Sequence, residues 1–242
     1  MIPHQWSIPD SIRERVGVQT LGRQRAIIEE GHLLLILHRQ PGPDQDHREG
    51  ALFWRTPEGQ WKSNLGSGRS IETLKDFLQD YHQTCDQLEE AYEKAHSTSD
   101  LFSILERVIP VNRASTHLFE TIQHARENLR EYTDLIEIRD VAYDNSRRYD
   151  LLLQDTKNAA DFKVARDSEA QAELSREALR ASHKLNLLAA MFFPLTALTS
   201  LFGMNFKSGL GDHVPFMFWI ILATGIVTGI FIKSWVLRSR EP

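Results

Sequence analysis

The stretch LNLLAAMFFPLTALTSLFGMNF, Leu185–Phe206, indicates the fold of this chain more directly than any other. It is about as long as the ~20 residues that a membrane-spanning helix needs, and it contains no charged side chain. Polar groups in hydrocarbon are costly unless a partner satisfies them. A helix that only anchors a domain therefore has no use for the polar residues found here, which are Asn186, Thr196, Thr199, Ser200 and Asn205. We predict a membrane helix with a role beyond anchoring.

Two stripes run along this helix and into the charged segment before it. Steps of alternating three and four residues, the spacing of a coiled-coil seam, define a polar stripe: Ser168, Ala172, Ser175, Leu179, Ser182, Asn186, Ala189, Phe193, Thr196 and Ser200. The same spacing defines a neighbouring apolar stripe: Leu174, Ala178, Ala181, Leu185, Leu188, Phe192, Leu195, Thr199 and Phe202. We interpret the apolar stripe as packing against sister helices and the polar stripe as facing a shared axial pore. The alternative is that small residues simply allow close helix packing.

The end of the stretch favours the pore. Gly203-Met204-Asn205 follows Pro194-Leu195-Thr196 and an aromatic residue, and a short loop then leads to a second span that ends in basic residues. In these features the chain resembles the CorA-type magnesium transporter family, whose signature is a Gly-Met-Asn tripeptide closing the first of two C-terminal membrane helices. The resemblance covers the C-terminal part well and the rest loosely. It implies a homo-oligomer, specifically a pentamer.

The resemblance also implies roles for particular residues. Mg²⁺ holds its water tightly, so a ring of Asn205 side chains would accept hydrogen bonds from the hydrated ion at the outer mouth, where Gly203 permits the backbone to bend. Phe193 and Leu185 stand where the family has large apolar pore residues, which would gate by dewetting. The selectivity residues are thus Gly203, Met204 and Asn205, and the predicted pore lining is Thr196, Phe193, Ala189, Asn186, Leu185, Ser182, Leu179, Ser175, Ser168 and Ser200.

Some positions depart from the family or allow two interpretations. Leu179 stands where the family has an inner-pore asparagine. Arg139-Asp140-Val141 and Tyr143-Asp144 are similar to the opening of the family's stalk helix, which implies that Asp144 binds a regulatory divalent ion between subunits. A carboxylate near a helix N-terminus is also favourable for its dipole alone. The segment before the stalk is shorter than the lobe that family members usually carry there.

Composition excludes several other classes. The chain has 242 residues and a formal net charge of −5, with no basic block, which argues against nucleic-acid binding. Cys85 is the single cysteine, so no intramolecular disulfide and no cysteine-based metal site can form. The first residues have no apolar core typical of a signal peptide. We find neither a glycine-rich phosphate loop nor a nucleophile constellation, and therefore predict no enzyme.

Before the stalk, short β-branched and aromatic runs predict an antiparallel meander of three or four strands, and the run LLLIL predicts a strand covered on both faces. From Ser70, apolar spacing predicts a helix to about Ala95, then a capped break at Ser97–Asp100. Pro110 is expected to kink or end the next helix, with helix again over 111–141. The acidic patch Asp86, Glu89, Glu90 and Glu93 and the pair His117 and His124 are interpreted as solvated helix faces rather than metal sites.

The flanking charges predict topology. Basic residues precede the first span and follow the second, which places both termini in the cytoplasm of a multi-pass protein of the cell (inner) membrane. Gly225 and Gly229 predict a contact face between the two spans. The predicted fold is α+β and mainly helical, divided as follows: cytoplasmic domain 1–144 (sheet about 24–65, helices about 70–144), stalk 145–184, first transmembrane helix 185–206, external loop 207–213, second transmembrane helix 214–234, and cytoplasmic basic tail 235–242.

The predicted function is divalent cation transport, with Mg²⁺ as the transported ion and also as the regulatory ion. An inside-negative potential supplies about 2.3 kcal/mol per charge per 100 mV, so no nucleotide is needed. The expected partners are further copies of this chain, the lipid bilayer and divalent cations, with no nucleic acid. Two alternatives remain open. One is a Zn²⁺, Ni²⁺ or Co²⁺ transporter of the same family, with or without proton coupling; the other is a non-conducting membrane-anchored helical scaffold.

Overall fold

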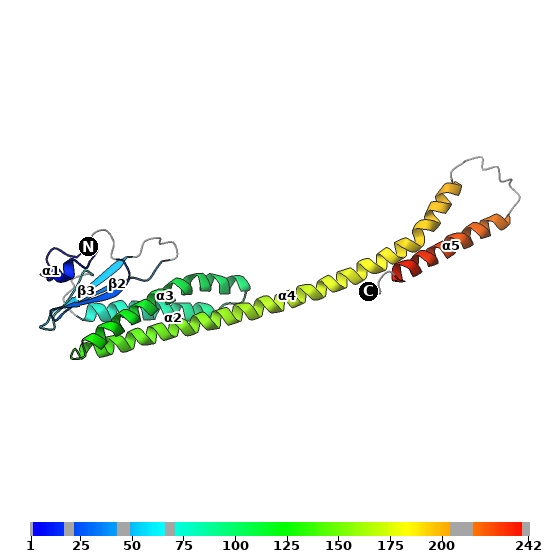
Figure 1. Ribbon diagram of the computed structural model, residues 1–242. Coiled ribbons are helices and arrows are strands. Elements are labelled where there is room, and N and C mark those ends of the chain that lie inside the picture. The colour runs from blue at the N-terminus through cyan, green and yellow to red at the C-terminus, as the bar shows by residue number, and fades with distance from the viewer. Residues whose placement is uncertain (1, 17–21, 43–48, 66–70, 204–214, 239–242) are drawn as a thin grey trace. The chain divides into compact units, whose positions relative to one another are not determined.

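The computed structural model describes residues 2–16, 22–42, 49–65, 71–203 and 215–238 (Figure 1). The chain divides into two compact units, Met1–Ala165, called unit 1, and Arg166–Pro242, called unit 2. The described elements follow in the order α1, β1, β2, β3, β4, α2, α3, α4 and α5. A mainly helical chain with one small antiparallel sheet confirms that part of the predicted fold class.

The four strands form one antiparallel sheet in sequential order: β1 Arg25–Glu29, β2 His32–His38, β3 Gly50–Arg55 and β4 Trp61–Ser63. The β1–β2 hairpin closes through Glu30 and Gly31, whose φ angles are 52° and 77°. Two adjacent residues with positive φ give the turn whose twist matches that of hairpin strands. The sheet confirms the meander predicted for about residues 24–65.

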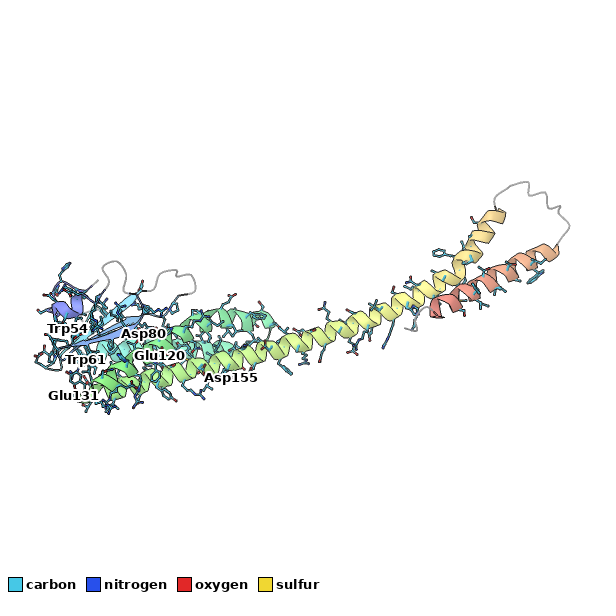
Figure 2. All side chains as sticks on the ribbon, viewed as in Figure 1. Trp54, Trp61, Asp80, Glu120, Glu131 and Asp155 are labelled. Atoms are coloured by element: carbon cyan, nitrogen blue, oxygen red, sulfur yellow. The ribbon has the colours of Figure 1, made fainter. Side chains whose placement is uncertain are left out.

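Both faces of the sheet are covered. On one face, Trp54, which is labelled in Figure 2, and Leu34 pack against the N-terminal segment, in which α1, Asp10–Arg13, contributes the fully buried Ile12. On the other face, Leu35 and its neighbours pack against the helices. The unalternating apolar run of β2 is therefore buried throughout, as predicted. The N-terminal segment gave no pattern in the sequence, and its role in covering the sheet was missed.

The first long helix, α2, spans Glu72–Glu93 and follows the predicted apolar face. Its buried residues are Leu74, Phe77, Leu78, Tyr81, Cys85 and Leu88. Burial raises the pKa of the Cys85 thiol to about 12, so this side chain acts as a small apolar group of the core.

The next helix, α3, runs without interruption from Thr98 to Asn128. It begins with a capping box, because the Ser97 side chain accepts from the Asp100 N–H and the Asp100 carboxylate accepts from the Ser97 N–H. Pro110 lies inside the helix, so of the two expected outcomes, a kink or an end, the end is wrong. Val108 and Val111, on either side of the proline, are buried in the core, and their packing offsets the missing backbone hydrogen bond.

The helical break instead follows Asn128, so the prediction of one helix over 111–141 is also wrong. Contacts with the sheet hold this turn: the Tyr132 hydroxyl donates to the Gly31 carbonyl at 2.9 Å, and the Arg55 guanidinium lies 3.5 Å from the Tyr132 ring centroid. One carboxylate oxygen of Asp134 accepts from Arg55 Nε at 3.0 Å and from Trp61 Nε1 at 2.9 Å. The sequence has no glycine or proline here, and tertiary contacts decide the boundary.

The last two helices are α4, Asp134–Gly203, and α5, Pro215–Arg238. The stalk helix was expected to open near Asn145 but begins at Asp134. Its first part belongs to unit 1, where Leu135, Ile138, Ala142 and Tyr149 join the core. The remainder of α4 and all of α5 belong to unit 2.

Candidate functional site

The polar stripe lies on the part of α4 that belongs to unit 2. Most of its side chains are exposed, including Asn186, Thr196 and Ser200, and Ala189 is half-buried. The two large members, Leu179 and Phe193, are 69% and 71% exposed. Apart from Ala189, the stripe residues are exposed among the described residues of unit 2, which leaves a line of mainly polar and small groups open along this part of α4.

The second helix of unit 2, α5, packs on a different seam of α4. Gly225 and Gly229 are buried while Ile226 and Val227 between them are exposed. A Cβ at Gly229 would lie 3.2 Å from the backbone oxygen of Met191, so the two helix backbones meet closely at this glycine. This contact confirms the prediction for the glycine pair.

Apart from Ala189, the half-buried residues of α4 in unit 2 identify that seam, which we call the α5 seam: His183, Leu187, Ala190 and Pro194. Each lies one residue after a member of the polar stripe, a step of about 100° around an α-helix. Members of the apolar stripe lie one residue before members of the polar stripe, and therefore on the side of the polar stripe opposite the α5 seam. The polar stripe is therefore flanked by the α5 seam and the apolar stripe.

The large members of the apolar stripe whose side chains are described are also exposed. Leu174, Leu185, Leu188 and Phe192 are each more than half exposed. These apolar side chains therefore remain available for packing against a further helix. A further helix laid on the apolar stripe would leave the polar stripe between that helix and α5.

Hydroxyl groups of unit 2 bond along their own helices. Thr196 donates to the Phe192 carbonyl at 2.8 Å, and on α5 Thr224 and Thr228 donate to the carbonyls of Ile220 and Thr224 at 2.8 Å. A hydroxyl that donates its proton still carries oxygen lone pairs that accept. These side chains are thus suited to accept hydrogen bonds from water around a cation.

Several predicted site residues lie at or beyond the end of the described segment. Gly203 is the last residue of α4. Met204 and Asn205, the other two residues of the selectivity tripeptide, and the external loop 207–213 lie outside the described residues. Over the part of the chain that the structure does describe, three or more metal-binding side chains gather nowhere. Among the same residues, no helix holds an apolar segment of sufficient length to cross a membrane.

Asp144, the candidate regulatory ligand, is exposed on the first part of α4. The next residue, Asn145, is buried and faces α2, where its amide donates to the Leu78 carbonyl at 2.9 Å. Its carbonyl oxygen lies 3.2 Å from Nδ1 of His82. Asn145 therefore links α4 to both the backbone and a side chain of α2.

Arg148, one turn further along α4, binds three side chains of α2. Its Nη2 lies 2.7 Å from Asp86 and 2.5 Å from Glu89, and its Nη1 lies 3.0 Å from His82 Nε2. The hydrogen bond from Arg148 lowers the pKa of the Asp86 carboxyl below its ordinary value. Tyr149 adds a hydroxyl bond of 2.6 Å to the Tyr81 carbonyl. We call these contacts the α2–α4 fastening.

The fastening corrects the interpretation of the acidic patch. Asp86 and Glu89 are not simply solvated, since both are ion-paired to Arg148, whereas Glu90 pairs with Lys94 on the surface and Glu93 is exposed. Sequence reasoning did not single out Arg148 or Asn145. A signal was present, because Asn145 continues the buried spacing of Ile138, Ala142 and Tyr149 and a polar residue there requires a partner.

The predicted surface histidines behave as expected. His117 and His124 are exposed on α3; His117 Nδ1 lies 3.1 Å from Glu120, and the Asn128 amide lies 3.4 Å from His124 Nδ1.

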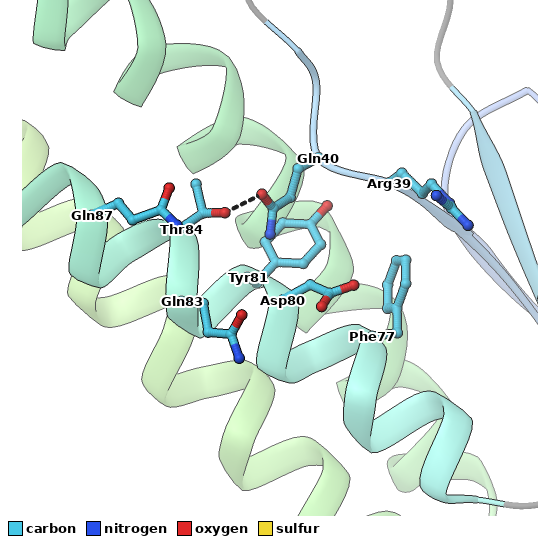
Figure 3. A pocket seen from close by; sticks show the side chains of 8 residues that line it. All are labelled: Arg39, Gln40, Phe77, Asp80, Tyr81, Gln83, Thr84 and Gln87. Atoms are coloured by element: carbon cyan, nitrogen blue, oxygen red, sulfur yellow. Dashed lines mark hydrogen bonds between the residues drawn. The ribbon is translucent and has the colours of Figure 1, made fainter.

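Unit 1 contains a cavity of about 320 Å³ beside α2 (Figure 3). Gln40 and Thr84 meet at its wall, with the Thr84 hydroxyl 2.5 Å from the Gln40 carbonyl oxygen. The Gln40 amide nitrogen is buried with no hydrogen-bond acceptor among the described residues. Arg39 and Asp80 supply charges of opposite sign, so this cavity suits polar groups but favours neither anions nor cations.

Comparison with known proteins relates most of the chain to a family of transporters. A family model described as "CorA-like Mg2+ transporter protein" matches residues 67–238. Two curated relatives, each named Zinc transport protein ZntB, come from Pectobacterium atrosepticum and Pectobacterium carotovorum subsp. carotovorum. They are 23% and 22% identical over 223 residues, which is 90% of this chain and 63% of each relative. The chain thus spans less than two thirds of the length of these relatives.

Two solved structures also align with the chain. The complete structure of the CorA magnesium transporter from Methanocaldococcus jannaschii aligns with a TM-score of 0.44 and 14% identity, over 94% of this chain and 82% of that one. The structure of the full-length CmaX protein aligns with a TM-score of 0.45 and 16% identity, over 91% of this chain and 78% of that one.

Proposed function

Because this chain belongs to the CorA-like Mg2+ transporter protein family, we propose that it moves divalent metal cations across a membrane. The observation that carries the proposal is the exposed polar stripe on α4, with the α5 seam on one side and the apolar stripe on the other. An ion path needs such a line of hydrogen-bonding groups, and a helix that only anchors does not.

The path forms between copies of the chain. We propose that α4 helices of a homo-oligomer gather about one axis, with the apolar stripes packed between neighbours and the polar stripes turned inward. Leu185, Leu188 and Phe192 are exposed in one chain and so are available for this packing. The resemblance to the family gives the number of copies as five.

The same proposal assigns a membrane location. Segments 185–206 and 214–234 are the two proposed spans, and each includes residues outside the described part of the chain. Basic residues flank the pair on both sides, which assigns both termini to the cytoplasm of the cell membrane and the loop 207–213 to the outside.

Within the pore, we assign the first contact of the hydrated ion to a ring of Asn205 amides, supported by Gly203 and Met204. Thr196 and Asn186 form polar rings deeper in, and Phe193 and Leu185 form apolar ones that gate the path. The Thr196 hydroxyl donates to its own helix, and its oxygen remains suited to accept from the water around a cation. Asp144 is proposed as a regulatory ligand for internal Mg²⁺.

Mg²⁺ is the proposed ion, driven inward by the membrane potential, and the description of the family model supports this choice. Zn²⁺ is the second candidate, because the curated relatives are named zinc transport proteins. The two ions are separated by measuring uptake of each into vesicles with and without a proton gradient. Dominant, proton-dependent Zn²⁺ uptake would replace Mg²⁺ by Zn²⁺ in this proposal.

The full chain in lipid vesicles, with a Mg²⁺-sensitive dye inside, tests the proposed path. Asn205→Ala should abolish voltage-driven uptake without changing the size of the assembly, because the first ring is lost. Thr196→Val should lower the rate at least tenfold, the effect of losing about 1.4 kcal/mol.

Thr228→Val on α5 is the matched control, since the Thr228 hydroxyl makes the same bond along its own helix at the same 2.8 Å. It should leave uptake unchanged. Equal rates for wild type, Asn205→Ala and Thr196→Val would refute the path and favour the non-conducting scaffold.

A further inference from the structure

A second, larger cavity of about 630 Å³ lies in unit 1, where α3 passes β1 and β2. Its walls come from three places: the residues just before β1, the end of β2 with the residues that follow, and α3 between Pro110 and Glu120. The volume falls within the ~300–1,000 Å³ of small-molecule sites. We call it the arginine cavity for the side chains described next.

Hydrogen bonds hold the walls in place. The Gln24 amide donates to the Ala114 carbonyl on α3 at 2.8 Å, and its oxygen accepts from the His38 N–H on β2 at 3.3 Å. His38 is 5% exposed, and its Nε2 lies 2.9 Å from the Gly22 carbonyl, so this nitrogen carries a proton. The bonds of Gln24 thus join the wall before β1 to both other walls, α3 and the end of β2.

The lining carries an excess of positive charge. Arg23, Arg39 and Arg113 line it, each from a different wall, and the single lining carboxylate among the described residues is Glu120. Glu120 is occupied by His117, and Arg39 has a long, exposed pair with Glu49 at 3.7 Å. For Arg23 and Arg113, no ion pair forms within the described part of the chain.

We propose that the arginine cavity binds a small organic phosphate carrying at least two negative charges. A guanidinium presents a planar fork of donors that matches phosphate oxygens in pairs. Three arginines exceed what one carboxylate can satisfy, whereas a phosphate offers several acceptor oxygens. The rings of Pro41 and Pro110 supply apolar wall for the organic part of the ligand. This site lies in unit 1 and does not depend on the proposed transport.

Calorimetry of the full chain in detergent, free of phosphate and of divalent cations, tests the proposal. Adenosine monophosphate and inorganic pyrophosphate are the probes, and adenosine is the uncharged comparison. We expect saturable binding of both anions, one per chain, and no measurable binding of adenosine. Since no flux is measured, loss of transport in other variants has no bearing on this result.

Arg23→Gln and Arg113→Gln should each weaken binding of the anions by about tenfold or more. Each variant loses a charge-assisted hydrogen bond to the phosphate, and such bonds are stronger than those between neutral groups. Both side chains are exposed, so the melting temperature should stay unchanged. Arg130→Gln, an exposed arginine after α3 that does not line the cavity, is the matched control. The proposal is overturned if neither anion binds saturably, or if Arg130→Gln weakens binding as much as the cavity variants.

Discussion

Replacing Arg148 by methionine should loosen the first part of α4 from α2. Methionine keeps the apolar length of the side chain but removes the guanidinium that binds Asp86 and Glu89 at 2.7 and 2.5 Å. The two carboxylates would then face each other with no cation between them, while Asn145 and Tyr149 keep their own bonds to α2.

The size of the effect follows from exposure. The Arg148 side chain is 21% exposed, and its partners are 55% and 41% exposed. Fully exposed ion pairs contribute about 0–1 kcal/mol, whereas breaking a buried pair costs about 3–5 kcal/mol. This half-buried group lies between the two, so we expect a loss of about 2 kcal/mol, or about 30-fold in the local opening equilibrium.

Hydrogen exchange measured by mass spectrometry is the suitable assay, because two units need not unfold as one two-state system. Peptides from α2 and from the first part of α4 should exchange about 30-fold faster in Arg148→Met. A double-mutant cycle with Asp86→Asn isolates the pair from other changes.

Arg147→Met is the matched control, since Arg147 is the preceding residue and pairs with Asp150 only at 3.7 Å with both side chains about half exposed. It should cost less than about 1 kcal/mol. The reasoning is refuted if both variants exchange at the same rate, or if the cycle gives no coupling between Arg148 and Asp86.

Two further predictions concern acid and the helix pair of unit 2. Because the pKa of Asp86 is lowered, its pairing with Arg148 stabilises the fold fully above the ordinary pKa of 3.8 and less as the pH falls below it. The difference in exchange rate between wild type and Arg148→Met should therefore shrink below about pH 4. A difference that stays constant would contradict this origin. Gly229→Leu should separate α5 from the Met191 backbone at a cost of about 1–3 kcal/mol, seen as a lower melting temperature than for Thr228→Leu; equal temperatures would contradict the close contact.

Local periodicity predicts the elements that bury one clear face. The spacing of Leu74, Tyr81, Cys85 and Leu88 predicts α2 with nearly correct bounds, and the apolar run in β2 predicts a strand buried on both faces. Both patterns are informative because burial of the apolar side chains directly stabilises the element that carries them.

Boundaries set by distant contacts were not predictable in the same way. Pro110 suggested a break that packing of Val108 and Val111 overcomes. The real break precedes Asp134, where Arg55 and Trp61 of the sheet bind its carboxylate. No residue type near Asp134 indicates binding partners that lie so far away in the sequence.

For the candidate site, periodicity predicts the stripes and the glycine contact but not which seam of α4 is free. That depends on where α5 packs, and the half-buried Leu187 and Ala190 reveal it only once the two helices are in place. Arg148 was missed because its partners, His82, Asp86 and Glu89, lie on another helix. The proposed roles of Asn205 and Asp144 stay predictions.

The α2–α4 fastening limits how α4 can move in unit 1. Turning α4 about its long axis by a single residue would pull Asn145, Arg148 and Tyr149 away from α2 together, and sliding it like a piston would do the same. The motion that keeps these bonds is one in which α2 and α4 move together relative to the sheet. A regulatory ligand that acts on unit 1 would therefore tilt α2 and α4 together and would not rotate α4 against α2.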